Sequence, residues 1–258
     1  MIGFSGTRLG LSWVIMEERW PKFKEASRMP YMDIAEIPLG NKGRKIALFC
    51  VLATIVGGTI VFIILIAGFM HEGLVPVLSI CEWVLITAGI LLPFTWLGTP
   101  KDFWQASIIA VIATAIACVV IFIMILVQSD QHENSYYQNP TLWTFSLGFG
   151  AILFAFGGAS VFPTIQNDMA DRSQFSKSVV IAFSGLLAMY LPVTVAGYAV
   201  QGYEVGDNIL LSVDVTSGVV KAAIVLQVVN LLGTYLITFN PIGQTFEGLF
   251  KVEGSKYA

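Results

Sequence analysis

The residues of this sequence best placed to do chemistry interrupt one long apolar stretch, 148–169. Gly157 and Gly158 weaken a helix, Ser160 adds a hydroxyl, and Pro163 removes a backbone N–H donor. An unpaired backbone group in hydrocarbon costs several kcal/mol, so a break survives there only inside protein or beside a watery cavity. The freed amides and carbonyls, with half-helix dipoles behind them, can hold a carboxylate, an ammonium or an ion. The pattern therefore predicts a ligand site, although close helix packing and a proline kink would use the same residues.

The composition places the chain in a broad class. Of its 258 residues, 56% are hydrophobic and 12% are charged, and the mean hydropathy is +0.77, whereas a soluble domain has about 25% charged residues. These values indicate an integral membrane protein embedded in a lipid bilayer. The net charge of −3 gives no reason to expect a nucleic-acid partner.

Metal, redox and hydrolytic chemistry have little support in the sequence. Cys50, Cys81 and Cys118 stand far apart in three apolar segments, and neither His71 nor His132 lies near them. We therefore predict no metal site, no disulfide framework and no cofactor. No nucleophile, base and orienting group occur together, so we predict that the protein is not an enzyme.

The elements that must position the break are predicted from the apolar stretches, because a spanning helix needs about 20 residues. We expect an all-α polytopic membrane protein with six full transmembrane helices and a partial N-terminal one. They are expected to form a single transmembrane domain over residues 1–258. The polar stretch 17–45 is predicted to be a cytoplasmic loop. The full spans are expected at about 46–70, 78–97, 103–127, 142–163, 178–200 and 215–239.

The basic residues set the predicted orientation. They are concentrated in 17–45 and recur at Arg172 and Lys177, whereas the polar stretches 128–141 and 201–214 contain neither lysine nor arginine. By the positive-inside rule, both termini are expected in the cytoplasm.

Glu82 is the one carboxylate close to a predicted span that needs a separate interpretation. A carboxylate within the membrane is a functional candidate by default. The neighbouring Trp83 also suits an interfacial anchor, which we favour.

Several stretches together resemble the amino acid/auxin permease family, which includes the vesicular inhibitory and the proton-coupled amino acid transporters. The similarity covers nearly the whole chain, and the motif around the glycine pair is its most specific part. The stretches are LGLSWVIMEERWP (9–21), PYMDIAE (30–36), FAFGGASVFPTIQNDMAD (154–171), DNILLS (207–212) and FNPIGQTFE (239–247).

The resemblance implies an inverted-repeat, broken-helix transporter fold of about eleven helices, in which the first and sixth helices are broken and enclose the substrate. On that correspondence this chain supplies the inner end of the second helix and then the third to the eighth. The break at Gly157 and Gly158 is then in the sixth helix. The chain is expected to be truncated at both ends and to hold one half of the substrate site.

The resemblance also implies a function: secondary-active transport of small neutral amino acids by alternating access, coupled to a proton or sodium gradient. The membrane is expected to be the plasma membrane or a vesicular or lysosomal membrane. The alternative is a truncated, non-transporting relative that associates with a full-length carrier and regulates it.

The residues expected to bind the substrate lie along the break, and further residues on other spans are expected to line the cavity. The backbone of Phe156, Gly157, Gly158 and Ala159, with the Ser160 hydroxyl, is expected to face the charged groups of the amino acid, and Phe156 and Phe162 to wall or gate the site. Possible cavity-lining residues lie on other spans, and for these a hydrogen bond between helices is the competing interpretation. They are Thr54, Thr59, Asn230 and Tyr235.

Overall fold

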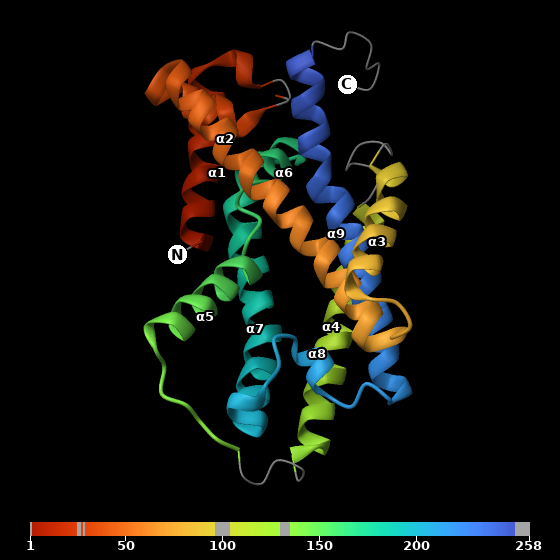
Figure 1. The fold of residues 1–258 in the computed structure, drawn as a ribbon. Helices are drawn as coiled ribbons and strands as arrows, with labels where there is room; N and C mark the ends of the chain where they lie inside the picture. Colours follow the sequence, from red (N-terminus) through yellow and green to blue (C-terminus); the bar gives the residue numbers. More distant parts are fainter. Residues whose placement is uncertain (1, 25–26, 28, 96–103, 130–134, 251–258) are drawn as a thin grey trace. The chain divides into compact units, whose positions relative to one another are not determined.

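The computed structural model describes residues 2–24, 27, 29–95, 104–129 and 135–250, and every regular element in these ranges is a helix (Figure 1). The chain divides into two compact units. Unit 1 contains Met1–Thr59, Ser146–Ser184 and Thr238–Ala258, and unit 2 contains Ile60–Phe145 and Gly185–Ile237. The all-helical fold class predicted from the sequence is thus observed in the described residues.

Unit 1 is built around the N-terminal helix and the segment that follows the predicted break. Trp13 is fully buried with Met16 and Phe23, and the ring centroids of Trp13 and Phe23 lie 6.0 Å apart. A second buried cluster joins Met32, Val51 and Ile55 to Ile242. The elements contributing to unit 1 are α1 (Ile2–Arg19), η1 (Pro21–Phe23), the first part of α2 (Pro30–Gly68), most of α5 (Leu142–Ala155), α6 (Phe162–Asp168), η5 (Arg172–Gln174), the first part of α7 (Phe175–Gln201) and the last part of α9 (Gly218–Phe250).

Helix α2 corrects one expectation, because it begins at Pro30, well inside the stretch 17–45 that was predicted to be a loop. The polar residues there pair with one another across Gly40: Arg44 Nη1 donates to the Asp33 carboxylate at 3.0 Å and also to Glu36. Gly40, with φ +62, lies in the left-handed region and marks a kink. High polarity therefore does not exclude a helix here.

Unit 2 has a core of small and branched apolar residues. Ile125, Val220 and Ile224 are fully buried, and a Cβ at Gly73 would stand only 2.7 Å from Ile224 Cδ1. The remaining elements are the rest of α2, α5, α7 and α9 together with η2 (Phe69–Leu74), α3 (Ile80–Phe94), α4 (Trp104–Val127), η6 (Gly202–Glu204) and α8 (Ile209–Ser212).

Glu82 has a local structural role at the start of α3. The Ser79 hydroxyl accepts from the Glu82 amide, and the Glu82 carboxylate accepts from the Ser79 amide at 2.8 Å, which forms a capping box. This contact places Glu82 at the start of a helix, and the favoured interpretation of Glu82 as an interfacial anchor remains a prediction.

Four of the described helical stretches are long and apolar enough to cross a bilayer: Pro30–Leu74, Ile108–Val127, Arg172–Gln201 and Gly218–Gly243. Helices α3 and α5, in two of the predicted spans, are shorter. The 14 residues of α5 extend only about 21 Å, less than a hydrocarbon core of about 30 Å. The predicted count of six full spans is therefore not confirmed.

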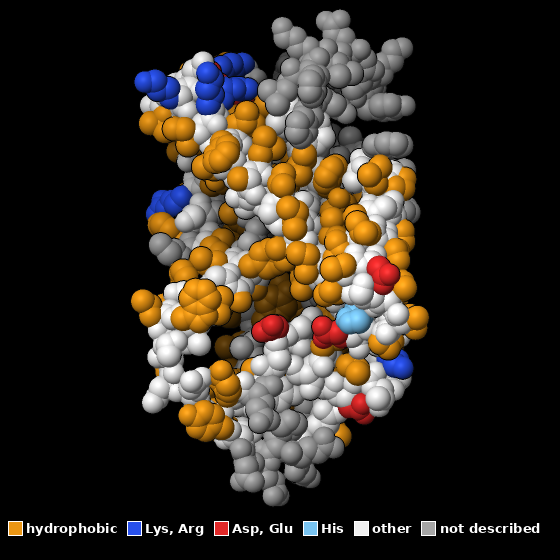
Figure 2. Space-filling model, viewed as in Figure 1, with side chains coloured by type: hydrophobic (Ala, Val, Ile, Leu, Met, Phe, Trp, Pro, Cys, Tyr) orange, Lys and Arg blue, Asp and Glu red, His pale blue; other side chains and the backbone are white. Residues whose placement is uncertain are grey.

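The surface of the helices is suited to lipid. Large apolar side chains are exposed along them, among them Phe49 at 74%, Leu85 at 73% and Ile181 at 72%. Figure 2 shows hydrophobic side chains across much of the face in view, with most of the visible Lys and Arg side chains gathered over the first part of α2. Together with the apolar helices, this indicates a multi-pass integral membrane protein.

Candidate functional site

The apolar stretch 148–169 forms two helices with a non-helical connection. Helix α5 ends at Ala155 and α6 begins at Phe162, consistent with the predicted break. Gly158 has φ +106, a conformation that L side chains rarely adopt. Pro163 occupies the first turn of α6, where its missing N–H breaks no helical hydrogen bond.

The connection leaves backbone groups available for a ligand. Its ends are closed by short-range hydrogen bonds, from Gly157 N to Phe154 O at 2.9 Å and from Val161 N to Gly158 O at 3.0 Å. Between them, the amides of Gly158, Ala159 and Ser160 donate no hydrogen bond to any described residue. Three successive N–H donors of this kind suit a carboxylate.

The two aromatic residues predicted to wall the site pack against other rings. Phe156 stacks on Phe183 of α7 with centroids 5.9 Å apart, and Phe162 meets the Phe183 ring edge-on at 6.3 Å. Phe162 also contacts the ring of Phe175 at 5.8 Å. These contacts anchor both ends of the connection to the start of α7.

Glycines on α1 let α6 and α7 approach closely. A Cβ at Gly6 would lie 2.7 Å from the Phe162 ring, and a Cβ at Gly10 would lie 2.5 Å from the Phe175 ring. Both distances are shorter than real carbon contacts. The i, i+4 spacing puts both glycines on one face of α1, against which the aromatic rings dock.

A polar junction completes the attachment of α6 to α1. Gln166 is 1% exposed, and its Nε2 donates to the carbonyls of Gly10 and Arg172, each at 3.0 Å. The Arg172 guanidinium forms an ion pair with Glu17, in which both side chains are less than one-fifth exposed. Glu17 also accepts from Trp13 Nε1 at 2.9 Å.

The junction extends to the connection between α1 and α2. The Asn167 side chain bonds the backbone of Ser27 in both directions, at 3.1 Å from Nδ2 to O and 3.3 Å from N to Oδ1. Arg172 Nη1 further donates to the carbonyl of Lys24 at 3.4 Å. Residues 166–172 therefore tie α6 to two segments more than 100 positions earlier in the sequence.

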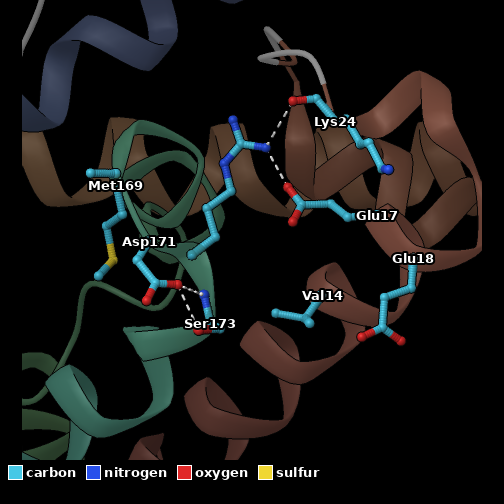
Figure 3. Close-up of a pocket in the computed structure, with 9 residues that line it drawn as sticks. Val14, Glu17, Glu18, Lys24, Met169, Asp171 and Ser173 are labelled. Atoms are coloured by element: carbon cyan, nitrogen blue, oxygen red, sulfur yellow. Dashed lines mark hydrogen bonds and ion pairs between the residues drawn. The ribbon is translucent and has the colours of Figure 1, made fainter.

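A cavity of about 760 Å³ lies beside this junction in unit 1. Figure 3 shows the Glu17 carboxylate and the Lys24 carbonyl turned toward one guanidinium, whereas the Glu18 carboxylate points away. The Ser173 hydroxyl and then its amide hold the pKa of Asp171 below its usual value by donating to that carboxylate. Most of the charges here are satisfied by protein groups, which indicates a structural junction and not the predicted amino acid site. The residues around the cavity are Val14, Glu17, Glu18, Lys24, Met169, Ala170, Asp171, Arg172 and Ser173.

Two of the four possible cavity-lining residues hydrogen-bond to carbonyls within their own helix, α2. Thr54 is exposed and donates to Cys50 O at 2.8 Å, and the buried Thr59 donates to Val56 O at the same distance. Asn230 and Tyr235 belong to unit 2, whereas the break belongs to unit 1. A role for these four residues in binding remains a prediction.

The sequence analysis did not identify the most heavily bonded residues near the break. Gln166 and Asn167 were included only as part of a family motif, Glu17 had no assigned role, and Arg172 was used as a basic residue that indicates the orientation. A buried glutamine can be suspected from its place on the apolar face of a short helix. Its partners cannot, because they are 156 positions away in one case.

Comparisons with known proteins agree with the resemblance seen in the sequence. Residues 6–257 match the family described as transmembrane amino acid transporter protein. The amino acid transporter AVT1D of Arabidopsis thaliana is 25% identical over 233 residues, and AVT1B of the same plant is 26% identical over 229 residues. Each alignment covers 85% of this chain and 42% of the relative.

A shorter similarity extends to another named transporter. The lysine histidine transporter-like 1 of the same plant is 30% identical over 108 residues, covering 40% of this chain and 24% of that relative. The chain spans less than half the length of AVT1D and AVT1B. No solved structure matches the chain.

Proposed function

Because the chain belongs to the transmembrane amino acid transporter family, and not to a family of enzymes, we propose that it carries small neutral amino acids across a membrane by alternating access. The substrate site is the connection between α5 and α6. AVT1D and AVT1B are named amino acid transporters, which favours transport over the alternative of a regulatory subunit of a full-length carrier.

The observation that supports this proposal most directly is the set of unpaired backbone amides at Gly158, Ala159 and Ser160 among the described residues. An amino acid presents a carboxylate and an ammonium, and these amides and the carbonyls near them complement both groups. The site adds no net charge of its own, since residues 156–162 contain no ionisable side chain. It therefore suits a ligand that is itself neutral overall.

The remaining parts of the proposal concern energy, orientation and membrane. Transport is driven by a proton or sodium gradient. Both termini face the cytoplasm, because the Lys- and Arg-rich stretch 17–45 belongs on that side. The membrane is the plasma membrane or a vesicular or lysosomal one, and the helices form part of an inverted-repeat fold.

Uptake into proteoliposomes tests the function and the site together. The protein should accumulate labelled alanine when an inward proton or sodium gradient is applied, and dissipating the gradient should abolish accumulation. In Gly158→Ala, a Cβ in the left-handed region distorts the connection, so the uptake rate should fall about tenfold or more.

Gly150→Ala is the matched control, because Gly150 lies in α5 and a Cβ there meets no atom within 4 Å. It should retain the wild-type rate. Equal uptake by Gly158→Ala and the wild type would remove the connection as the site. Absence of gradient-driven uptake by the wild type would contradict the proposed function itself.

A further inference from the structure

The two helices that flank the break differ in how far their residues are buried. Three of the seven residues of α6 are buried, namely Pro163, Gln166 and Asn167, whereas none of the 14 residues of α5 is buried. The buried residues of α6 therefore fix one end of the connecting backbone, while Phe156 at the other end stacks on Phe183. Any residue that holds α6 in place also places the amides of Gly158 to Ser160.

Gln166 is the residue of α6 best suited to this task. Its amide is the only part of the side chain that can donate, and it reaches two backbone carbonyls on different segments, Gly10 of α1 and Arg172 after α6. The side chain is 1% exposed, so these carbonyls cannot be satisfied by water in its place without rearrangement. Loss of one partner in a buried hydrogen bond leaves the other group unsatisfied.

The hydrogen bond from Gln166 to the Arg172 carbonyl connects α6 to a second part of α1. Arg172 supplies its backbone oxygen to Gln166, and its side chain joins Glu17 at the end of α1. A single amide thus links α6 to α1 directly and, through Arg172, to the far end of the same helix. The glycine face of α1 allows this approach, since Gly10 lies against both Phe175 and Gln166.

We infer that Gln166 is a positioning residue for transport: it fixes α6 on α1 and so keeps the amides of Gly158, Ala159 and Ser160 arranged for the substrate. The inference rests on the proposed function for its kinetic consequence and on contacts within unit 1 for its structural consequence. Gln166 touches no substrate in this scheme. It acts through the backbone of the connection.

The structural consequence can be measured without transport. Nitroxide labels are attached to cysteines at the exposed positions Phe4 of α1 and Ile165 of α6, after Cys50, Cys81 and Cys118 have been replaced by serine. In the labelled protein that retains Gln166, electron paramagnetic resonance should give one narrow distribution of the distance between the two labels. Gln166→Leu and the shape-conserving Gln166→Glu, which both lack the N–H donor, should broaden it.

The kinetics of uptake by the Gln166 variants distinguish a positioning role from a role in the stability of the whole protein. If the binding-competent arrangement is less populated, the apparent KM for the amino acid should rise about tenfold while Vmax is retained. A fall in Vmax at unchanged KM would instead mean fewer folded molecules and would overturn the inference. Gln138→Glu, an exposed change outside the junction, should alter neither value.

The two measurements also separate this inference from the proposed function. If the distance distribution between the two labels stays narrow in both Gln166 variants, the positioning role is overturned, whatever rate of uptake those variants show. Failure of the wild type to transport, with broadening in the Gln166 variants, would contradict the function and leave the contact established. Should Gln166→Leu fail to fold, the milder Gln166→Glu decides the outcome.

Discussion

At the scale of single residues, glycine serves two different physical purposes in unit 1. Gly158 is required for its backbone conformation, with φ +106 in the connection between α5 and α6. Gly6 and Gly10 have ordinary helical backbones but allow Phe162 and Phe175 to lie against α1. The first kind of glycine shapes the candidate site, and the second kind holds its neighbouring helix in place.

Alanine substitution along α1 should reveal the second purpose. Gly10→Ala places a Cβ 2.5 Å from a ring atom of the buried Phe175, so we expect a loss of about 1–3 kcal/mol in the free energy of unfolding. Gly3→Ala on the same helix meets Phe183 at an ordinary 3.5 Å and should be tolerated. Thermal unfolding in detergent compares the two variants, and equal melting temperatures would contradict the packing argument.

At the scale of elements, α1 and the segment 162–174 form the best-connected pair of unit 1. Apolar docking of aromatic rings on glycines is combined with hydrogen bonds from Gln166 and an ion pair from Arg172 to Glu17. The ion pair is largely removed from water, so neither partner is easily replaced by solvent. The pair between Arg44 and Glu36 of α2 is much more exposed, at 36% and 46%.

This difference in exposure predicts a difference in stability. Glu17→Gln keeps the side-chain shape but leaves the Arg172 charge without its partner, and we expect a loss of about 1–3 kcal/mol. Glu36→Gln removes a solvent-screened partner and should change stability by less than about 1 kcal/mol. Denaturant titration in detergent measures both, and a larger effect at Glu36 than at Glu17 would disprove this ranking.

At the scale of the whole molecule, the decisive property is the apolar surface of the helices. Ile112 and Ile116 of α4 are 54% and 47% exposed in a stretch of mean hydropathy 3.2. Such a surface is unfavourable in water and favourable in lipid. The bilayer therefore acts as the solvent for these helices.

A lysine on this surface should hinder insertion into a membrane. Ile116→Lys puts a charge near the middle of α4, at a cost of about 2.5–3.5 kcal/mol for insertion at a helix centre. Val77→Lys lies in the connection before α3, at an 83% exposed position, and should insert normally. A glycosylation-based insertion assay measures both fractions; normal insertion of Ile116→Lys would count against α4 as a lipid-facing span.

Much of the fold class and the position of the break could be predicted from the sequence. Long apolar stretches and a shortage of charges require helices in lipid, since only internal hydrogen bonds satisfy the backbone there. The adjacent Gly157 and Gly158, followed by Pro163, locate a helix interruption by local backbone preference alone. These features depend on residues close together in the chain, which is why composition and spacing reveal them.

The sequence was less informative about lengths and partners. It predicted a loop over 17–45, where α2 already begins at Pro30, because charge counts do not show that Arg44 will neutralise Asp33 and Glu36. It also predicted six full spans, of which two contain helices shorter than a bilayer requires. Helix ends depend on caps and tertiary contacts more than on hydropathy.

By itself, then, the sequence determined a helical membrane protein with a helix interrupted around Gly157, Gly158 and Pro163, and a resemblance to amino acid carriers. Only the tertiary structure decided how the interruption is held: by Gln166 on Gly10, by Arg172 on Glu17, and by aromatic rings on the glycine face of α1. The physical reason is the distance along the chain over which each kind of interaction acts. Backbone preferences act over a few neighbouring residues, whereas these contacts join groups about 150 positions apart, whose meeting depends on how the helices pack.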